Sequence, residues 1–186
     1  MKVRRADHHG EVIVELNRQD EPRMEVATRT ALQPPFRIKR ILVPIDFSEC
    51  SSKAFQYALP FVKEHQAAIS LQYVVPQTYG TSEYGAIDSM GLQTSMRDTG
   101  EKDLAKLAAD EVGGVVANDT VVRVGSPARK IVEVARSLPA DLIVISTHGP
   151  TGLKHVFLGS IAEHVVQRAP CPEFIVRERE HEILPK

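Results

Sequence analysis

Residues 141–166 read "DLIVISTHGPTGLKHVFLGSIAEHVV" and combine three signals that indicate the fold. The apolar run at 141–147 predicts a buried strand, because continuous apolar residues are typical of strands that are covered on both faces. The apolar spacing at 160–169 predicts a helix. Gly149 lies where the strand ends and Gly159 lies where the helix begins. The stretch therefore predicts a strand, a loop and a helix in direct succession.

The same alternation of strands and helices occupies the chain from residue 40 onward. It predicts an α/β fold with an open, five-stranded, parallel, doubly wound (Rossmann-like) sheet in a three-layer α/β/α arrangement. Ligands of such sheets bind beyond the carboxyl ends of the strands, where the strand order reverses. The predicted strands are 40–46, 68–76, 120–125, 141–147 and 172–178, and the predicted helices are 51–67, 101–112, 126–138 and 160–169.

Three local features refine this outline. Pro60 should kink the first helix or end its first part. Residues 77–96 are polar and contain glycine, which predicts a long loop, and loops of that length are usually functional or mobile. Ser126 and Pro127 suit the N-cap and the first position of the third helix.

The N-terminal part of the chain differs in composition from the rest. It is rich in charge and ends near Pro34 and Pro35, which predict an extended linker. Alternation at 11–17 predicts a strand, and a weaker strand pattern follows at 23–29. We expect three parts: an extension at 1–37 that is partly strand-like or disordered, an α/β domain at 38–179, and a polar tail at 180–186.

Composition excludes several classes of protein. The chain of 186 residues is 42% hydrophobic and 25% charged, with a net charge of −1, so it has neither the charge expected of a nucleic-acid-binding protein nor that of a membrane-surface protein. No apolar run has the length of a signal peptide or a membrane span, so we expect a cytoplasmic protein. Cys50 and Cys171 stand far apart, and we expect both thiols to be buried as small apolar groups.

The two glycine corners suggest a phosphate pocket. Gly149 permits a positive φ and lets an anion approach bare backbone, and a helix that starts at Gly159-Ser160 offers free N–H groups to phosphate. Lys154 and His155 could add positive charge. The alternative is that Ser160 and Glu163 form a capping box, which would explain both residues without a ligand.

Asp46, at the end of the first predicted strand, is the candidate for contact with a nucleoside or a metal ion. Its carboxylate could accept a hydrogen bond from a ribose hydroxyl or an adenine amino group, or hold a metal through water. The alternative is that it caps the following helix. His148 could contact phosphate or be merely exposed. The sequence shows no set of nucleophile, base and acid, so binding is favoured over turnover.

The motifs at 40–54, 71–75, 124–135 and 141–176 resemble, in order and spacing, the universal stress protein family. The resemblance implies a five-stranded parallel fold, usually homodimeric, that often binds ATP through a glycine motif. The second and third glycines of that motif match Gly149 and Gly159, and its terminal residue matches Ser160. The first glycine is replaced by Ser146. In the family the aspartate after the first strand contacts the nucleoside and the backbone at the second strand holds adenine, which points to Asp46 and Val74.

The resemblance thus implies a stress-response sensor or signalling module that binds ATP, possibly with Mg²⁺, and is a homodimer through its C-terminal edge strand, residues 173–177. No nucleic-acid or membrane partner is expected. Two alternatives stay open: a slow ATPase or autophosphorylating protein that uses Asp46, Ser160 and His148, and a nucleotide-free dimeric interaction module. The expected nucleotide-binding residues are Pro44, Ile45, Asp46, Val74, Ser146, His148, Gly149, Gly159, Ser160 and Ile161.

Overall fold

The computed structural model describes residues 2–5, 12–15, 37–77, 89–112, 118–147 and 158–177. The chain divides into two compact units, residues 1–37 and residues 38–186. In the second unit, five strands form one parallel sheet in the order β5-β4-β3-β6-β7, which confirms the predicted fold class. The strands are β3 (Arg40–Ile45), β4 (Ala68–Pro76), β5 (Asn118–Gly125), β6 (Leu142–Ser146) and β7 (Glu173–Val176).

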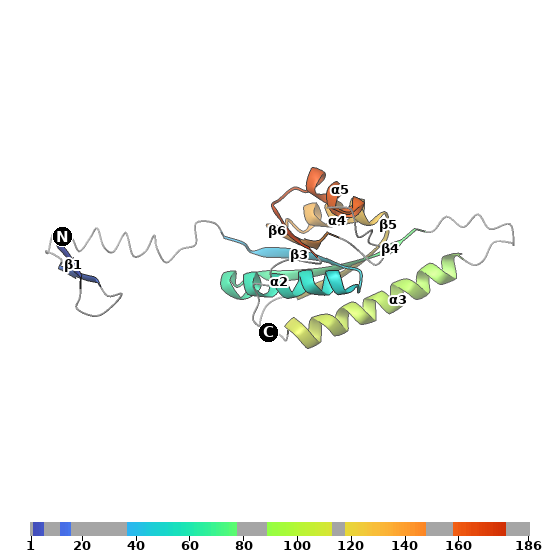
Figure 1. Ribbon diagram of the computed structural model, residues 1–186. Coiled ribbons are helices and arrows are strands. Elements are labelled where there is room, and N and C mark those ends of the chain that lie inside the picture. Colours follow the sequence, from blue (N-terminus) through green and yellow to red (C-terminus); the bar gives the residue numbers. More distant parts are fainter. Residues whose placement is uncertain are drawn as a thin grey trace. The chain divides into compact units, whose positions relative to one another are not determined.

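Helices cover both faces of this sheet (Figure 1). The helices α2 and α3, with the short π-helical segment η1, lie on one face, and α4 and α5 lie on the other. Among the described residues no helix is long and apolar enough to cross a bilayer. The bounds are α2 (Glu49–His65), α3 (Ser89–Leu107), η1 (Ala108–Val112), α4 (Pro127–Ser137) and α5 (Ser160–Arg168).

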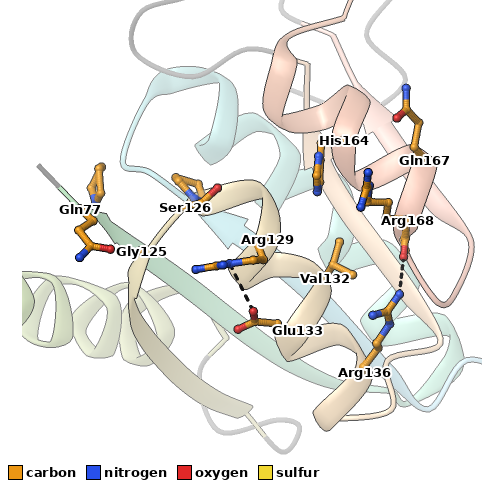
Figure 2. A pocket seen from close by; sticks show the side chains of 13 residues that line it. Gln77, Gly125, Ser126, Arg129, Val132, Glu133, Arg136, His164, Gln167 and Arg168 are labelled. Carbon is orange, nitrogen blue, oxygen red and sulfur yellow. Dashed lines mark hydrogen bonds and ion pairs between the residues drawn. The ribbon is translucent and has the colours of Figure 1, made fainter. Parts of the chain in front are cut away.

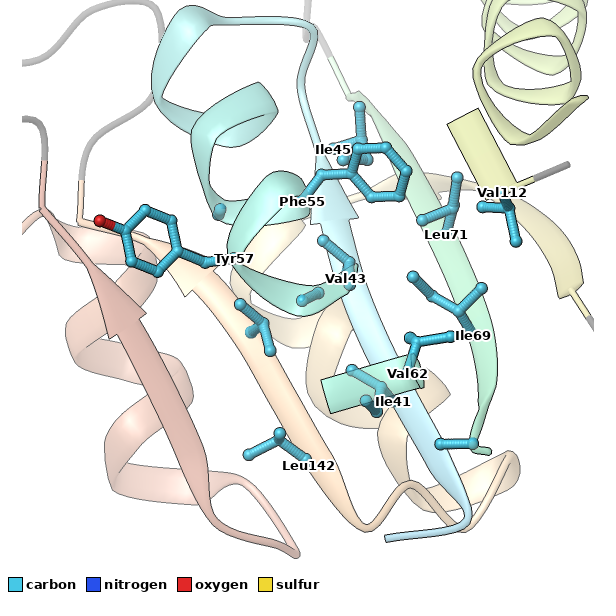
Figure 3. Packing of buried hydrophobic residues seen from close by; sticks show 14 of the residues in the cluster. Ile41, Val43, Ile45, Phe55, Tyr57, Val62, Ile69, Leu71, Val112 and Leu142 are labelled. Carbon is cyan, nitrogen blue, oxygen red and sulfur yellow. The ribbon is translucent and has the colours of Figure 1, made fainter. Parts of the chain in front are cut away.

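The first hydrophobic core lies between the sheet and α2 and α3. In Figure 3, Phe55 of α2 lies over Ile45 at the carboxyl end of β3, and both side chains are buried. At the far side of this core, Phe174 of β7 packs against Tyr57 and Phe61 of α2, with ring centroids 6.2 Å and 5.4 Å apart. The aromatic contacts join α2 to the edge strand as well as to the centre of the sheet.

The second core lies under α4 and α5. It holds Leu42 and Ile143, which point to the opposite face from their neighbours in β3 and β6, together with Val132 of α4 and Val165 of α5. A continuous apolar strand thus contributes to both cores, as expected for a sheet that is covered on both sides. Gln72 is also fully buried, and its amide donates to the carbonyl of Lys130 in α4 at 3.0 Å.

The predicted loop at 77–96 is wrong in its second half, because α3 begins at Ser89. The sequence predicted a helix only from residue 101, whereas Gly100 is itself a buried residue of α3. A Cβ placed there would lie 2.3 Å from a ring carbon of Tyr73. Glycine therefore stands at this position so that the helix can approach the ring of Tyr73 on β4 closely.

Two further predictions need correction. Of the two outcomes predicted for Pro60, an end of the helix is wrong, because α2 continues to His65. Pro60 is exposed, so water can satisfy the carbonyl that loses its partner. The expected burial of Cys50 and Cys171 is also wrong, because both side chains are only half-buried, and the two cysteines form no disulfide with each other.

The N-terminal unit contains an antiparallel hairpin of β1 (Lys2–Arg5) and β2 (Val12–Glu15). The alternation at 11–17 thus marks a real strand, whereas the partner strand was missed because Lys2–Arg5 is mostly cationic. In the register of this hairpin Lys2 is the partner of Glu15 and Arg5 is the partner of Val12. The second predicted strand, 23–29, lies outside the described residues.

Candidate functional site

The sheet has its switch point between β3 and β6, where the strand order reverses. The ladder between these strands has two residue pairs, Ile41 with Leu142 and Leu42 with Ile143. Both strands continue beyond the last pair, to Ile45 and Ser146. By contrast, β3 pairs with β4 along its whole length. The strands β3 and β6 therefore separate toward their carboxyl ends, which is where doubly wound sheets bind ligands.

Asp46 follows β3 directly at this opening and is half-buried. One carboxylate oxygen accepts hydrogen bonds from the backbone N–H of Ser48 at 3.0 Å and from its hydroxyl at 2.5 Å. Ser48, rather than Asp46, caps α2, because the Ser48 hydroxyl accepts from the N–H of Ser51. The alternative of Asp46 as a helix cap is thus wrong. Ser48 instead fixes the orientation of the Asp46 carboxylate.

The next residue, Phe47, has a φ of 60°, which is uncommon for a bulky residue and costs free energy unless the surroundings hold it. Its ring contacts that of Tyr73 on β4, with centroids 5.1 Å apart. Half-exposed at the carboxyl edge, the Phe47 ring ties the corner after Asp46 to the neighbouring strand.

Val74 lies one residue beyond the last β3–β4 pair, Ile45 with Tyr73. Continued by one step, this register sets Val74 beside Asp46, since neighbouring strands lie about 4.8 Å apart. The side chains of Val74 and Ile45 are both buried, so these residues can offer only backbone groups to a ligand. Pro44 is half-buried within β3 and has no N–H to donate.

Gly159 joins the start of α5 to the end of β6. Its N–H donates to the carbonyl of Thr147 at 2.9 Å, and the Thr147 N–H donates in turn to the carbonyl of Val176 in β7 at 2.9 Å. The first residue of α5 is Ser160, and Gly159 is the N-cap, in an extended conformation with φ −70° and ψ 154°. The helix therefore starts directly at the carboxyl edge of the sheet.

The predicted capping box at Ser160 and Glu163 is wrong. Glu163 donates its N–H to the carbonyl of Gly159 at 2.9 Å, so Ser160 is the first helical residue and not the cap. Glycine has no side chain with which to cap, and α5 has no side-chain cap. Among the described residues no acceptor binds the N–H groups of Ser160 and Ile161, which a helix leaves unpaired in its first turn. These donors carry the positive end of the helix dipole.

The remaining expected residues divide into two groups. Ser146 ends β6 and is half-buried, and the side chain of Ile161 is 39% exposed. His148 and Gly149 lie outside the described residues, as do Lys154 and His155. The structure thus places Asp46, Val74, Ser146, Gly159 and Ser160 at the carboxyl ends of the strands. The roles of His148 and Gly149, in the middle of the glycine motif, stay a prediction.

A pocket of about 930 Å³ lies elsewhere, between α4 and α5 (Figure 2). It contains none of the ten expected residues. Part of its lining, Pro76 and Gly125 to Pro127, follows the carboxyl ends of β4 and β5. The rest comes from α4 and α5 and could not be predicted from the sequence, because polar residues on amphipathic helices are usually only solvated. The switch point is a separate place in the sheet, where the Asp46 carboxylate held by Ser48 lies across from N–H groups of α5 that no described residue binds.

The model of the universal stress protein family matches residues 37–177. This chain belongs to the universal stress protein family. Among its relatives, universal stress protein MJ0531 of Methanocaldococcus jannaschii is 35% identical over 150 residues, which cover 77% of this chain and 85% of that protein.

Solved structures of family members share the fold. Universal stress protein UspA from Lactobacillus plantarum superposes with a TM-score of 0.64 at 26% identity, over 76% of this chain and 99% of that one. A family protein from Arabidopsis thaliana with AMP bound has a TM-score of 0.54 at 20% identity, over 76% of this chain and 92% of that one. At that identity the second likeness concerns the fold alone.

Proposed function

We propose that this universal stress protein binds ATP, with Mg²⁺, at the switch point and acts as a nucleotide-dependent sensor or signalling module in a stress response. The observation that carries the proposal is the opening between β3 and β6, with the Asp46 carboxylate after one strand and the uncapped start of α5 held at Thr147 after the other. The AMP bound to the Arabidopsis thaliana protein of the same fold supports an adenine nucleotide.

The residues on the two sides suit different parts of the nucleotide. One oxygen of Asp46 is engaged by Ser48, and the other can accept a hydrogen bond from a ribose hydroxyl. The N–H groups of Ser160 and Ile161 can bind phosphate oxygens, which helix N-termini attract. The backbone at Val74 would contact adenine. Gly149 would add backbone donors on the phosphate side, as the glycine motif implies.

Magnesium would depend mainly on the nucleotide. Among the described residues no group of three or more His, Cys, Asp or Glu could hold a metal ion. Mg²⁺ prefers octahedral oxygen ligands, retains several waters and is commonly held by substrate phosphates with one or two carboxylates. Here the phosphates would supply most of its ligands, and Asp46 could contribute through water. The ion would neutralise phosphate charge.

We further propose that the site binds nucleotide without rapid turnover. Asp46 is held by Ser48, and the described part of the site contains no second carboxylate or histidine within hydrogen-bond distance of Asp46 that could serve as a general base. Enzymes commonly turn over at about 10 per second, and we expect phosphate release far below that rate. Fast release by a preparation free of contaminating ATPases would favour the slow-ATPase alternative instead.

A homodimer through β7 completes the proposal. The strand β7 pairs only with β6 and forms an edge of the sheet. The carbonyls of Pro172 and Val176 bond to β6, so by alternation the N–H and C=O groups of Ile175 face away from β6. An edge of this kind leaves groups that a second copy can pair.

Two measurements test nucleotide binding. Mass spectrometry of protein purified without denaturation should detect co-purified ATP, ADP or AMP, and calorimetry should show ATP binding by the full chain. Asp46→Ala should weaken ATP binding by about tenfold, since a hydrogen bond to a charged group contributes about 1.5–3 kcal/mol. The control Asp110→Ala removes an exposed carboxylate from η1 and should leave the affinity unchanged. Equal affinity in all three proteins would reject the role of Asp46.

A further inference from the structure

The pocket between α4 and α5 is lined by three arginines and one histidine. Arg129 and Arg136 come from α4, and His164 and Arg168 come from α5. Among the described lining residues Glu133 is the one carboxylate. In Figure 2 these side chains are arranged along the channel that separates the two helices. We call this pocket the basic groove.

The basic side chains are spread along the groove and are not gathered at one point. Arg129 and Arg136 are seven residues apart, which puts them on one face of α4 and separates them by about 10 Å along the helix axis. His164 and Arg168 are four residues apart and share one face of α5. Val132, only 5% exposed, lies between the two arginines of α4 and provides an apolar floor.

The single carboxylate is already engaged at one end of the groove. Glu133 lies 2.6 Å from the ammonium of Lys130 and 3.5 Å from the guanidinium of Arg129. The hydrogen bond from Lys130 is the main cause that lowers the pKa of Glu133, so this carboxylate is ionised at neutral pH.

The guanidinium groups at the other end have no such partner. Arg136 donates to the backbone carbonyl of Arg168 at 3.1 Å. In the described ranges no carboxylate lies within ion-pair distance of Arg136 or Arg168. Two permanent positive charges therefore remain available to an external anion.

We propose that the basic groove binds an acidic segment of a partner protein. Charges that are about 10 Å apart along α4 exceed the reach of a single phosphate, whereas carboxylates along a polypeptide are spaced at several ångströms per residue. Guanidinium groups bind carboxylates in a bidentate manner, and the apolar floor at Val132 suits side chains between the carboxylates. No Phe, Tyr or Trp is among the described residues that line the groove, and the net charge of the chain is −1, which disfavours nucleic acid.

This proposal does not depend on nucleotide binding, because the basic groove and the switch point share no residue. The test uses the full chain and a fluorescein-labelled peptide of ten glutamates, with fluorescence anisotropy as the readout. The wild-type protein should bind the peptide, and added salt should weaken binding because it screens exposed charges. A ten-lysine peptide should not bind.

Variants locate the site. The double variant Arg136→Gln/Arg168→Gln should weaken peptide binding by about tenfold, which corresponds to about 1.4 kcal/mol. The control Arg123→Gln removes an exposed arginine of β5 that also donates to a backbone carbonyl, that of Val122 at 2.9 Å, and should bind as the wild type does. Asp46→Ala should bind the peptide as the wild type does, and the double variant should bind ATP as the wild type does. Peptide binding and ATP binding can therefore be tested separately, and loss of one does not affect the test of the other.

Four results would overturn the proposal. The first is no binding by the wild type, and the second is equal binding by the double variant. The third is competition by another anion. If inorganic phosphate displaces the peptide at a concentration equal to that of the peptide, or if a ten-nucleotide single strand binds more tightly than the peptide, the groove binds phosphate groups and not carboxylates. The fourth concerns the chain's own acidic tail. If Glu178→Gln/Glu180→Gln/Glu182→Gln in the full chain strengthens peptide binding, the tail and not a partner is the occupant.

Discussion

The amide of Gly159 donates a 2.9 Å hydrogen bond to the carbonyl of Thr147, and this bond joins the first turn of α5 to the end of β6. Thr147 is buried, with 3% of its surface exposed. Because its own N–H donates to the carbonyl of Val176, the backbone of Thr147 holds both the helix start and the end of β7. The first-turn N–H groups of α5, which no described residue binds, are thus held in place before any ligand arrives, which reduces the ordering cost of binding.

Ser146→Gly restores the first glycine of the family motif at the end of β6. We expect it to tighten ATP binding about threefold, or by about 0.65 kcal/mol, because the phosphates can then approach bare backbone. Calorimetry measures the affinity. The control Ser137→Gly, at the end of α4, should leave the ATP affinity unchanged. A weaker ATP affinity in Ser146→Gly would show instead that the side chain of Ser146 contacts the nucleotide.

Gly100→Ala should destabilise the fold although alanine favours helices. The new Cβ would lie 2.3 Å and 2.5 Å from two ring carbons of Tyr73, and overpacking of this kind costs about 1–3 kcal/mol, against a helix-propensity gain of about 1 kcal/mol. We expect a net loss of about 1 kcal/mol in the free energy of unfolding, measured with urea.

A second glycine of α3 provides the matched control for that experiment. Gly91 is exposed, so Gly91→Ala should gain about 0.5–1 kcal/mol from helix propensity alone. If Gly100→Ala has the same free energy of unfolding as Gly91→Ala, α3 does not approach the ring of Tyr73 as closely as described.

The sequence was sufficient for the sheet but not for the helix ends. The apolar patterns located all five strands of the domain, and the predicted span 68–76 coincides with β4. The signal is strongest for β3, β4 and β6, whose residues are mostly buried, because strands that are covered on both faces are typically continuous apolar runs. The start of α3 was missed because Gly100 has the local appearance of a breaker, and only the contact with Tyr73 explains it. The sequence around Gly100 does not indicate that the ring of Tyr73, on β4, packs against it.

The candidate site was predictable to a similar degree. Asp46 and Gly159 could be placed at strand and helix ends from pattern alone, but whether each residue was a cap required coordinates. Ser160 matches a capping box, yet the helix begins one residue earlier than that motif requires. The basic groove had no sequence signal beyond the spacing of Arg136 and Arg168 on separate helices, because their proximity depends on how α4 and α5 pack.

The thiol of Cys171 should react slowly with alkylating reagents. Burial raises its pKa from 9.0 to about 11, with smaller contributions from the carboxylates of Glu173 and Asp141. Only the thiolate reacts, so between pH 9 and pH 11 the folded chain should carry less thiolate at this position than the unfolded chain. Mass spectrometry of the alkylated peptide measures the rate against pH. A midpoint near 9 in the folded protein would contradict the raised pKa.

Ile175→Pro should disrupt the proposed homodimer. Proline removes the N–H of Ile175, which faces away from β6, and edge positions of this kind tolerate proline within their own sheet. The control Ile175→Ala removes side-chain packing but keeps the N–H. Light scattering should give a dimer for the wild type and for Ile175→Ala, and a monomer for Ile175→Pro.

The N-terminal unit provides the alternative explanation of oligomeric state. A monomeric full chain that dimerises when residues 1–37 are removed would reject full-chain dimerisation and would show that this segment blocks it. A dimer that survives Ile175→Pro would instead reject β7 as the interface.

The most direct test of the central claim is a calorimetric titration of ATP into the wild type, Gly159→Ala and Gly159→Val. The backbone angles of Gly159 are open to any residue, so thermal unfolding should stay within a few degrees of the wild type while the side chain crowds the phosphates. We predict tight binding by the wild type, weaker binding by Gly159→Ala, and a loss of at least about tenfold in Gly159→Val, which is about 1.4 kcal/mol. Equal ATP affinity in the three folded proteins would contradict a nucleotide site at the switch point.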